Sequence, residues 1–358
     1  MIRIEQFVRL SKYAGERFDL VQAAGGNSSV KFDNGLMLVK ESGNSLTEVE
    51  LDKGYVELET KKIIEILEDK RLLSLKKKEK DILVRGLLKD SPQKQQRTPS
   101  IEIFLHALLY RYTLHVHPLV INAIVCRKDY SKILRGLFSE KIAVVNYVTP
   151  GIELALKLQK VIQKYQNAHH EKPKVVFLQN HGLIVSSDDP KECVKLLEGF
   201  LEKAEKHLGV NFNEYKLTNK VSELVNSLKN THYISYVSWD NKLISFLKSK
   251  KTLFFKKPFC PDGVVYCGVV PLKITNLKDK KPFIVYRQKF KQVPRIVIFN
   301  DQIFFVGQNV KQAREIEDVL KSNLLTLDST KGKVNFLKRK EIDYLTTWEA
   351  ERYRKNKV

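Results

Sequence analysis

The sequence has few cysteines and no long hydrophobic run. Its 358 residues include four cysteines, and none of them forms a Cys-x-x-Cys pair, so the sequence indicates neither a disulfide framework nor a zinc ribbon. No run of about 18 apolar residues occurs, which argues against a membrane-spanning helix. The first residues also lack the apolar segment of a secretory signal peptide. We therefore expect a cytoplasmic protein with reduced thiols.

Arginine is scarce relative to lysine. The chain has 63 basic and 41 acidic residues and a formal net charge of +22, a balance that many nucleic-acid-binding proteins share. However, 48 of the basic residues are lysines and 15 are arginines, whereas recognition of bases and phosphates favours the arginine fork. No basic motif interleaved with aromatic residues is present. We expect no main role in nucleic-acid binding, and the charge remains compatible with an anionic small molecule.

The length and the 43% hydrophobic content are sufficient for two domains. Up to residue 212 the apolar patterns alternate between helical and strand periods, whereas lysine-rich segments separated by short strands follow. We therefore divide the chain into residues 1–212 and an extension, residues 213–358. We detect no internal repeat.

Local patterns predict the following elements. Helices are expected at 1–20, over most of 55–90, and at 99–110, 151–164, 190–207, 311–325 and 340–355, with Thr98 as a cap and 92–97 as a polar linker. Strands are expected at 30–32, 36–40, 114–117, 142–145, 175–179, 183–185, 264–267, 283–286, 296–299 and 302–307.

Two histidines lie two residues apart in one of these strands. Because side chains alternate faces along a strand, His115 and His117 point the same way while Val116 faces the opposite layer. This spacing lets both rings reach a single metal ion. An isolated pair of this kind is more often a pair of surface or core histidines, so the neighbouring residues must decide.

A third histidine, His181, is expected in a turn between two strands. There it could complete a set of three ligands, the number that catalytic zinc takes while keeping one position open. Glu102 falls in the first turn of the helix expected at 99–110, where the helix dipole favours an anion. Taken alone, this carboxylate is better explained as a helix-capping or dipole-stabilising residue.

Two loops rich in small residues, 25–29 and 42–45, follow the first helix. Glycine allows a backbone to approach a ligand closely, and Asn and Ser side chains suit phosphate oxygens. Each loop alone is more often a simple turn. The spacing matches neither the Walker motif nor Gly-x-Gly-x-x-Gly, so we expect no nucleotide-binding fold.

Five short motifs occur in an order that resembles the class II aldolase/adducin family across roughly residues 1–210. They are Gly-Gly-Asn-Ser-Ser at 25–29, Ser-Gly at 42–43, Pro-Ser-x-Glu at 99–102, His-x-His-Pro at 115–118 and Gln-Asn-His-Gly-Leu at 179–183. The remaining third, including 261–268 and 348–353, resembles the extension that follows the aldolase module in bifunctional rhamnulose-1-phosphate aldolase/dehydrogenases. Their dehydrogenase domain is missing from this sequence.

The resemblance implies a three-layer α/β/α fold with a central mixed sheet, followed by a smaller α+β extension, and a homo-oligomer that is often a tetramer. It also implies that His115, His117 and His181 bind a divalent cation, usually Zn²⁺, and that Glu102 is the acid/base. The residues that match phosphate-binding positions are Gly26, Asn27, Ser28, Ser42, Gly43 and Ser100. One departure is Ile101, where the small aldolases often carry a second serine.

The activity that the resemblance implies is cleavage of a ketose phosphate to dihydroxyacetone phosphate and an aldehyde through a zinc-stabilised enediolate. Members of the same family also epimerise, decarboxylate or dehydrate sugar phosphates, and adducin-like heads associate with proteins without the metal histidines. These remain alternatives. The presence of all three histidines together with Glu102 favours an enzyme. No motif identifies the tyrosine that protonates the aldehyde in the small aldolases.

Overall fold

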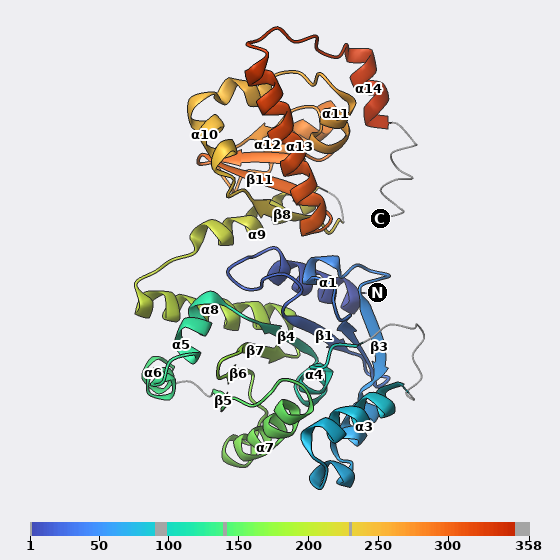
Figure 1. The fold of residues 1–358 in the computed structure, drawn as a ribbon, viewed down its shortest axis with the longest axis vertical. Helices are drawn as coiled ribbons and strands as arrows, with labels where there is room; N and C mark the ends of the chain where they lie inside the picture. Colours follow the sequence, from blue (N-terminus) through green and yellow to red (C-terminus); the bar gives the residue numbers. More distant parts are fainter. Residues whose placement is uncertain (1, 90–98, 139–141, 229–230, 348–358) are drawn as a thin grey trace. The chain divides into compact units, whose positions relative to one another are not determined.

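The computed structural model describes residues 2–89, 99–138, 142–228 and 231–347 (Figure 1). Packing within the chain separates two compact units, Met1–Phe212 and Asn213–Val358. Each unit has its own sheet and its own hydrophobic cores. The fold is mixed α/β, as expected. No helix in the described ranges has both the length and the apolar character needed to cross a membrane.

The first unit is built on a seven-stranded mixed sheet in the order β3-β2-β1-β4-β7-β6-β5. Its strands are β1 (Asn27–Lys31), β2 (Leu36–Lys40), β3 (Tyr55–Glu59), β4 (Tyr112–Val116), β5 (Ala143–Val145), β6 (Val175–Leu178) and β7 (Gly182–Ser187). All neighbours are antiparallel except β5 and β6, which are parallel. The central strand β4 is buried along its whole length.

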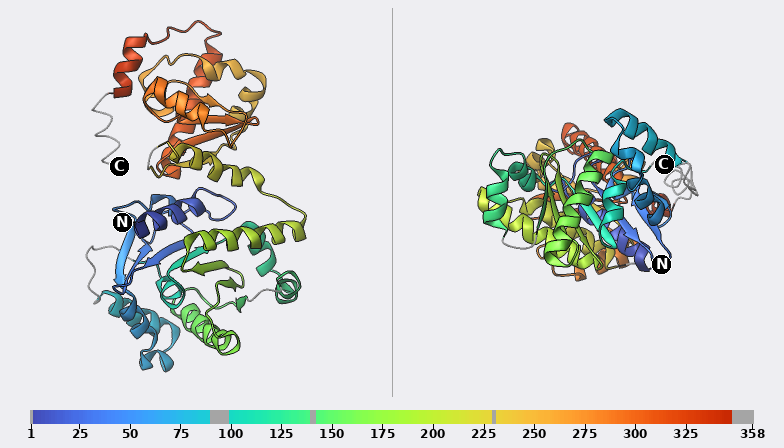
Figure 2. Two further views of the ribbon diagram at one scale, coloured as in Figure 1. Left: turned by 180° about the vertical axis from the view of Figure 1, so that it is seen from behind. Right: turned by 90° about the horizontal axis from the view of Figure 1, so that it is seen from below.

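Helices cover both faces of this sheet, which gives three layers (Figure 2). The helices are α1 (Ile2–Gly15), α2 (Thr60–Leu67), α3 (Lys77–Lys89), α4 (Ile103–Leu108), α5 (Leu119–Val125), α6 (Tyr130–Leu137), α7 (Ile152–His169) and α8 (Pro190–Leu208), with short 3₁₀ turns at Leu46–Glu48 and Lys70–Leu73. One core lies against α1, α5 and α8; the other lies against α2, α4 and α7. Alternation along β4 sends Leu114 and Val116 into the first core and leaves His115 on the α4 side.

Three local predictions in the first unit need correction. Residues 55–59 form strand β3 and not a helix, because Val56 and Leu58 alternate into the core. The helix expected at 99–110 is limited to α4, and Glu102 lies just before its first residue. The helix expected at 1–20 ends at Gly15, and residues 16–20 form turns.

The second unit has a four-stranded sheet in the order β8-β11-β10-β9. Its elements are α9 (Asn213–Asn226), β8 (Ile234–Val237), α10 (Asn241–Ser249), a 3₁₀ helix (Lys251–Phe255), α11 (Pro261–Cys267), β9 (Leu272–Lys273), α12 (Lys281–Phe290), β10 (Ile296–Phe299), β11 (Gln302–Gly307), α13 (Val310–Ser329) and α14 (Arg339–Thr347).

The strands predicted at 264–267 and 283–286 are wrong, because both segments belong to helices. Val264 and Cys267 on α11 are buried, as are Phe283 and Tyr286 on α12. A spacing of three residues places each pair on one helical face. A proline in the first turn starts each helix.

The second unit repeats the strand order of half of the first, although no repeat is detected in the sequence. Strands β4, β5, β6 and β7 pair in the order β4-β7-β6-β5, and β8, β9, β10 and β11 pair in the order β8-β11-β10-β9. In both, the last pair is parallel and the other pairs are antiparallel. The helices also correspond, since α5 and α8 share one core as α10 and α13 do.

Three predicted features lie outside the described residues. They are the linker at 92–97, the cap at Thr98 and everything beyond residue 347, which includes the motif at 348–353.

Candidate metal centre

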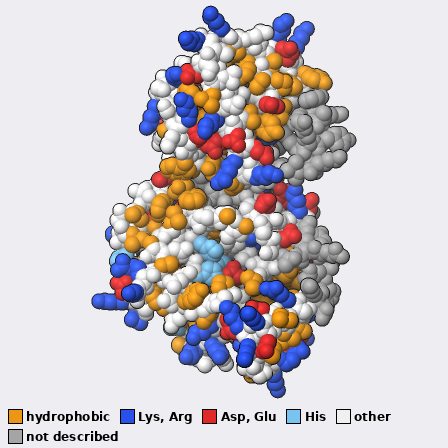
Figure 3. Space-filling model, in the orientation of Figure 1, with side chains coloured by type: hydrophobic (Ala, Val, Ile, Leu, Met, Phe, Trp, Pro, Cys, Tyr) orange, Lys and Arg blue, Asp and Glu red, His pale blue; other side chains and the backbone are white. Residues whose placement is uncertain are grey.

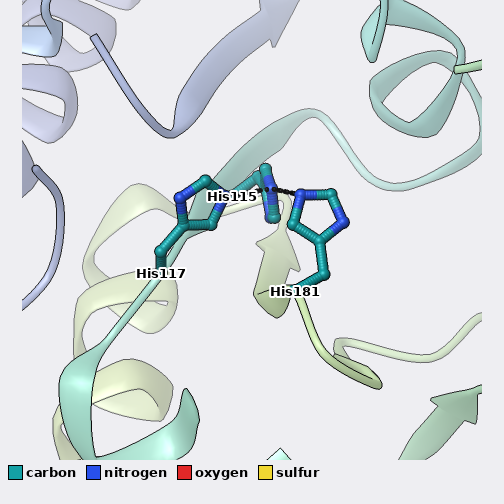
Figure 4. Close-up of side chains that lie close together, drawn as sticks. All are labelled: His115, His117 and His181. Carbon is teal, nitrogen blue, oxygen red and sulfur yellow. Dashed lines mark hydrogen bonds between the residues drawn. The ribbon is translucent and has the colours of Figure 1, made fainter. Parts of the chain in front are cut away.

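Three histidine side chains converge at the end of strand β4 (Figure 4). His115 Nε2 lies 3.0 Å from His117 Nε2 and 3.3 Å from His181 Nε2. Three nitrogens that bind one tetrahedral ion at 2.0 to 2.1 Å are separated by about 3.3 Å. The two separations from His115 therefore match ligands of a single ion, and all three ligand atoms lie within 4.8 Å of one another. No other group of three or more His, Cys, Asp or Glu residues in the described chain has metal-ligand geometry.

His115 is held rigidly in the middle of the sheet. Its backbone pairs with Asn27 of β1 and with Ile184 of β7. Its Nδ1 lies 3.1 Å from the Leu183 carbonyl oxygen, so we assign the proton to Nδ1, which leaves the Nε2 lone pair for a metal. Burial lowers the pKa of His115 to about 3, although Glu102 opposes this shift. The ring is therefore neutral at physiological pH.

His117 and His181 come from segments that flank the sheet, and two glycines make room for them. A Cβ at Gly25 would lie 3.2 Å from His117 Nδ1, and one at Gly182 would lie 2.9 Å from His117 Cδ2 and 2.4 Å from the Val116 carbonyl oxygen. A side chain at Gly182 could not be accommodated without moving the backbone. The glycine that follows His181 thus lets the turn approach β4.

Glu102 lies directly beside these rings. Its Oε1 is 3.1 Å from His181 Nε2 and its Oε2 is 3.6 Å from His115 Nε2. The Asn27 amide donates to Oε2 at 3.0 Å. Burial would raise the pKa of Glu102, but the two histidines and Asn27 outweigh it and hold the pKa well below its usual range. Glu102 is thus a buried, ionised carboxylate.

The centre reaches the surface, since a group of histidine side chains is visible on the first unit in Figure 3. The side chain of His181 retains 15% of its accessible surface, whereas that of His115 is fully buried. His181 is therefore a ring of the centre that solvent can reach.

The residues predicted to hold phosphate divide into two groups. Asn27 and Ser100 meet at Glu102, since the Asn27 amide also donates to Ser100 Oγ at 2.9 Å. An isolated bridge between Glu41 and Pro99 brings the exposed loop of Ser42 and Gly43 next to this segment.

The other two predicted residues are not brought to the histidine side. Ser28 is fully buried, and its Oγ lies 2.7 Å from Ser11 Oγ of α1. Gly26 packs its backbone against Val21 and the His115 carbonyl oxygen. Both residues therefore shape the scaffold beneath the site.

Sequence reasoning missed Lys40, at the end of β2. Its buried ammonium group donates to the carbonyl oxygens of Ala24 (3.3 Å), Glu41 (3.3 Å) and Asn44 (2.6 Å). Lys40 therefore joins the two small-residue loops. Burial lowers the pKa of Lys40 to about 8, and Glu102 is the main charge that opposes this. The sequence shows only that a lysine lies two residues before Ser42, which does not reveal its burial.

His106 of α4 is a second buried histidine, for which the sequence indicates no more than a pairing with Glu102 on one helix face. Its Nδ1 lies 2.8 Å from Ser29 Oγ, and its Nε2 is buried without a hydrogen-bond partner in the described residues. Burial lowers the pKa of His106 to about 3. Between about pH 6.5 and pH 3 the unfolded chain takes up a proton here that the folded chain does not, so acid destabilises the fold.

We expect His106→Gln to make the metal-free protein less sensitive to acid. Each such histidine reduces the free energy of unfolding by about 1.4 kcal/mol for each pH unit below the unfolded pKa. Urea denaturation at pH 6.5, 5.5 and 4.5 in the presence of a chelator should show a shallower pH slope in the variant. The exposed His207 of α8 provides a control as His207→Gln, which should keep the wild-type slope. Equal slopes in all three proteins would contradict this account of His106.

The layered sheet and the three convergent imidazoles define an α/β protein with a candidate divalent-metal centre. Residues 5–208 match the family described as class II aldolase and adducin N-terminal domain. The chain belongs to this family, which agrees with the resemblance seen in its motifs.

Individual relatives match parts of the chain. The uncharacterized oxidoreductase YuxG of Bacillus subtilis (strain 168) is 28% identical over 120 residues, which are 33% of this chain and 17% of that protein. Among solved structures, the N-terminal class II aldolase domain of a conserved Thermoplasma acidophilum protein has 25% identity and a TM-score of 0.47, covering 57% of this chain and 92% of that one. A sugar-phosphate aldolase from Thermotoga maritima has 16% identity and a TM-score of 0.41, with coverages of 59% and 97%.

Proposed function

We propose that the first unit is a metal-dependent aldolase that cleaves a ketose phosphate to dihydroxyacetone phosphate and an aldehyde. The observation that carries this proposal is the convergence of three imidazole Nε2 atoms beside the carboxylate of Glu102. A divalent cation held by His115, His117 and His181, Zn²⁺ or another, would supply a Lewis acid for the negative charge that develops as the carbon–carbon bond breaks.

Glu102 is the proposed acid/base. In the condensation direction its carboxylate would take a proton from the carbon next to the ketone, and in the cleavage direction it would return that proton to the same carbon. Its lowered pKa keeps it in the form that accepts a proton. The Asn27 amide, which donates to Oε2, orients the carboxylate.

The two small-residue loops are the proposed phosphate subsite. Asn27 and Ser100 present polar groups beside Glu102. The Asn27 Oδ1 atom, which is buried without a partner in the described residues, is an acceptor and suits a hydroxyl group of the substrate. The ammonium group of Lys40 places a positive charge between the loops. Because its donors already point at three carbonyl oxygens, Lys40 would act through charge and loop position and not through a direct hydrogen bond.

Replacing Lys40 with methionine is expected to raise KM for a phosphorylated ketose by about tenfold, the loss typical of one interaction with a charged group. The effect on an unphosphorylated analogue should be smaller. Steady-state kinetics with both substrates measures the difference. Lys31→Met is the matched control, because Lys31 is partly buried in the same sheet but donates to the Ala107 and Leu109 carbonyl oxygens at the end of α4. A KM change of the same size in both variants would contradict the role of Lys40.

The activity is tested by incubating the purified chain, loaded with Zn²⁺ or Mn²⁺, with a panel of ketose 1-phosphates. Release of dihydroxyacetone phosphate supports the proposal. Epimerised product, or decarboxylation of a keto-acid phosphate in a parallel panel, would replace cleavage with a related reaction at the same centre. Failure of the purified protein to bind any divalent metal would favour an association domain instead.

A further inference from the structure

His117 lies just beyond the part of the chain that the sheet holds in place. Strand β4 ends at Val116, so His115 is paired on both sides whereas His117 follows the last paired residue. The backbone N–H of His117 donates to the Leu20 carbonyl oxygen at 2.9 Å. The position of this proposed ligand therefore depends on a segment far away in the sequence.

A second hydrogen bond joins the same two segments. The backbone N–H of Leu119 donates to the Asp19 carbonyl oxygen at 2.9 Å. The residue between, Pro118, has no N–H and cannot contribute such a bond. Residues 19 and 20 thus hold the backbone on both sides of Pro118.

Residues 16–21 lie between α1 and β1 and form turns without a regular helix or strand. The side chain of Arg17 retains 1% of its accessible surface and bonds Asp19 with both arms of its fork: Nε to Oδ1 at 2.9 Å and Nη2 to Oδ2 at 2.5 Å. Its own carbonyl oxygen accepts the N–H groups of Leu20 and Val21. A bidentate pair of this kind restricts both partners in direction as well as distance.

The same guanidinium group attaches this segment to two helices. Arg17 Nη1 donates to Glu198 Oε1 of α8 at 2.5 Å. The hydroxyl of Tyr13, on α1, donates to the same oxygen at 2.5 Å. The turn at 16–21 is therefore anchored to the helical layer that packs on β4.

We propose that Arg17 and Asp19 are positioning residues for His117, acting through the carbonyl oxygens of Asp19 and Leu20. The proposal rests on the proposed function in taking His117 as a metal ligand. The buried fork fixes the turn, the turn fixes the backbone of residues 117–119, and this backbone sets where the imidazole enters the centre. A lysine cannot replace the fork, because its single ammonium group does not make two parallel bonds to one carboxylate.

The chain offers a matched control for this pair. Arg127 and Asp129 form the same Arg-x-Asp fork, with Nε to Oδ1 at 2.8 Å and Nη2 to Oδ2 at 3.0 Å. Their side chains are 53% and 50% exposed. The substitution Arg127→Lys makes the same chemical change at the surface, where it should have no effect on the centre.

The first experiment needs no metal. Amide hydrogen exchange is measured in the metal-free full-length chain for wild type, Arg17→Lys and Arg127→Lys. In Arg17→Lys the amides of His117 and Leu119 should exchange at least about tenfold faster while those of Leu114 and Val116 keep their protection, since a local opening releases only these contacts. A uniform rise along β4, which a general loss of stability produces, would overturn the proposal, as would unchanged exchange at His117 and Leu119.

The second experiment measures Co²⁺ binding by competition with a chelator, together with the visible absorption spectrum of the bound ion. Arg17→Lys should bind Co²⁺ about 10- to 100-fold more weakly, as for loss of other groups that orient a ligand, with an altered spectrum; Arg127→Lys should match wild type. Equal affinities and spectra in all three proteins would overturn the proposal.

If Arg17→Lys does not fold, Asp19→Asn serves for both experiments, since it keeps one acceptor oxygen and loses the charge. A wild-type chain that binds no metal would defeat the proposed function, and the exchange experiment would still decide whether Arg17 holds residues 117–119.

Discussion

Replacing Glu102 with glutamine is expected to lower kcat for retro-aldol cleavage by about 10²- to 10⁴-fold, the usual range for loss of general acid–base assistance. The amide has the shape of the carboxylate but can neither take up nor return a proton. The three imidazoles are unchanged, so the variant should still bind a metal. Steady-state turnover of the active ketose phosphate, with metal content measured on the same sample, tests both parts.

Ser100→Ala is the matched control for this substitution. Ser100 lies two residues before Glu102, and its hydroxyl accepts a bond from the same Asn27 amide. Its loss disturbs the same local network without removing a proton carrier, so kcat should fall far less. Full turnover in Glu102→Gln would contradict the acid/base role. Equal losses in both variants would indicate that Glu102 matters mainly for local structure.

The parts of the site that follow from short-range geometry could be predicted from the sequence. Alternation along a strand places His115 and His117 together, and the turn before Gly182 exposes His181. Lys40 and Arg17 could not be assigned roles in this way. Asp19 and Asn44 are close in sequence to these residues, but the contacts with Glu198 and Ala24 depend on how loops and helices meet in space. Neither lysine nor arginine carries a local signal for burial.

The repeated arrangement of helices and strands is a feature of the fold that could not be predicted from the sequence. The order of elements is the same in both units, yet no motif reveals it, because many hydrophobic patterns satisfy one arrangement of helices and strands. The two errors in the second unit, at 264–267 and 283–286, have a related cause. Short runs rich in Val, Ile, Tyr and Phe are compatible with a buried strand or a buried helix face, and packing decides between them.

The correspondence also shows what the second unit lacks. In the first unit, His115 pairs with Ile184, the third residue of β7. At the corresponding place in the second unit, Val237 pairs with Phe304, the third residue of β11. His117 directly precedes the N-cap of α5, and Trp239 directly precedes the N-cap of α10. The turn that carries His181 has three residues between paired positions, whereas the corresponding turn consists of Asn300 and Asp301. A position for a third ligand is therefore missing.

These differences lead to the prediction that the chain binds one equivalent of divalent metal, all of it in the first unit. His115→Ala should weaken binding by more than about 10²-fold, since one of three ligands carries roughly a third of a binding free energy near 10 kcal/mol. Metal analysis after dialysis against a weak chelator should then give about one equivalent in wild type and almost none in the variant.

His207→Gln, which changes an exposed histidine of α8, is the control and should retain the wild-type metal content. A full equivalent remaining in His115→Ala would place the ion elsewhere. Two equivalents in wild type, with one lost in His115→Ala, would mean that a separate ligand set exists outside the three convergent rings. One equivalent that disappears with His115 alone fits the geometry, because His115 is the ring that lies within 3.3 Å of both of the others.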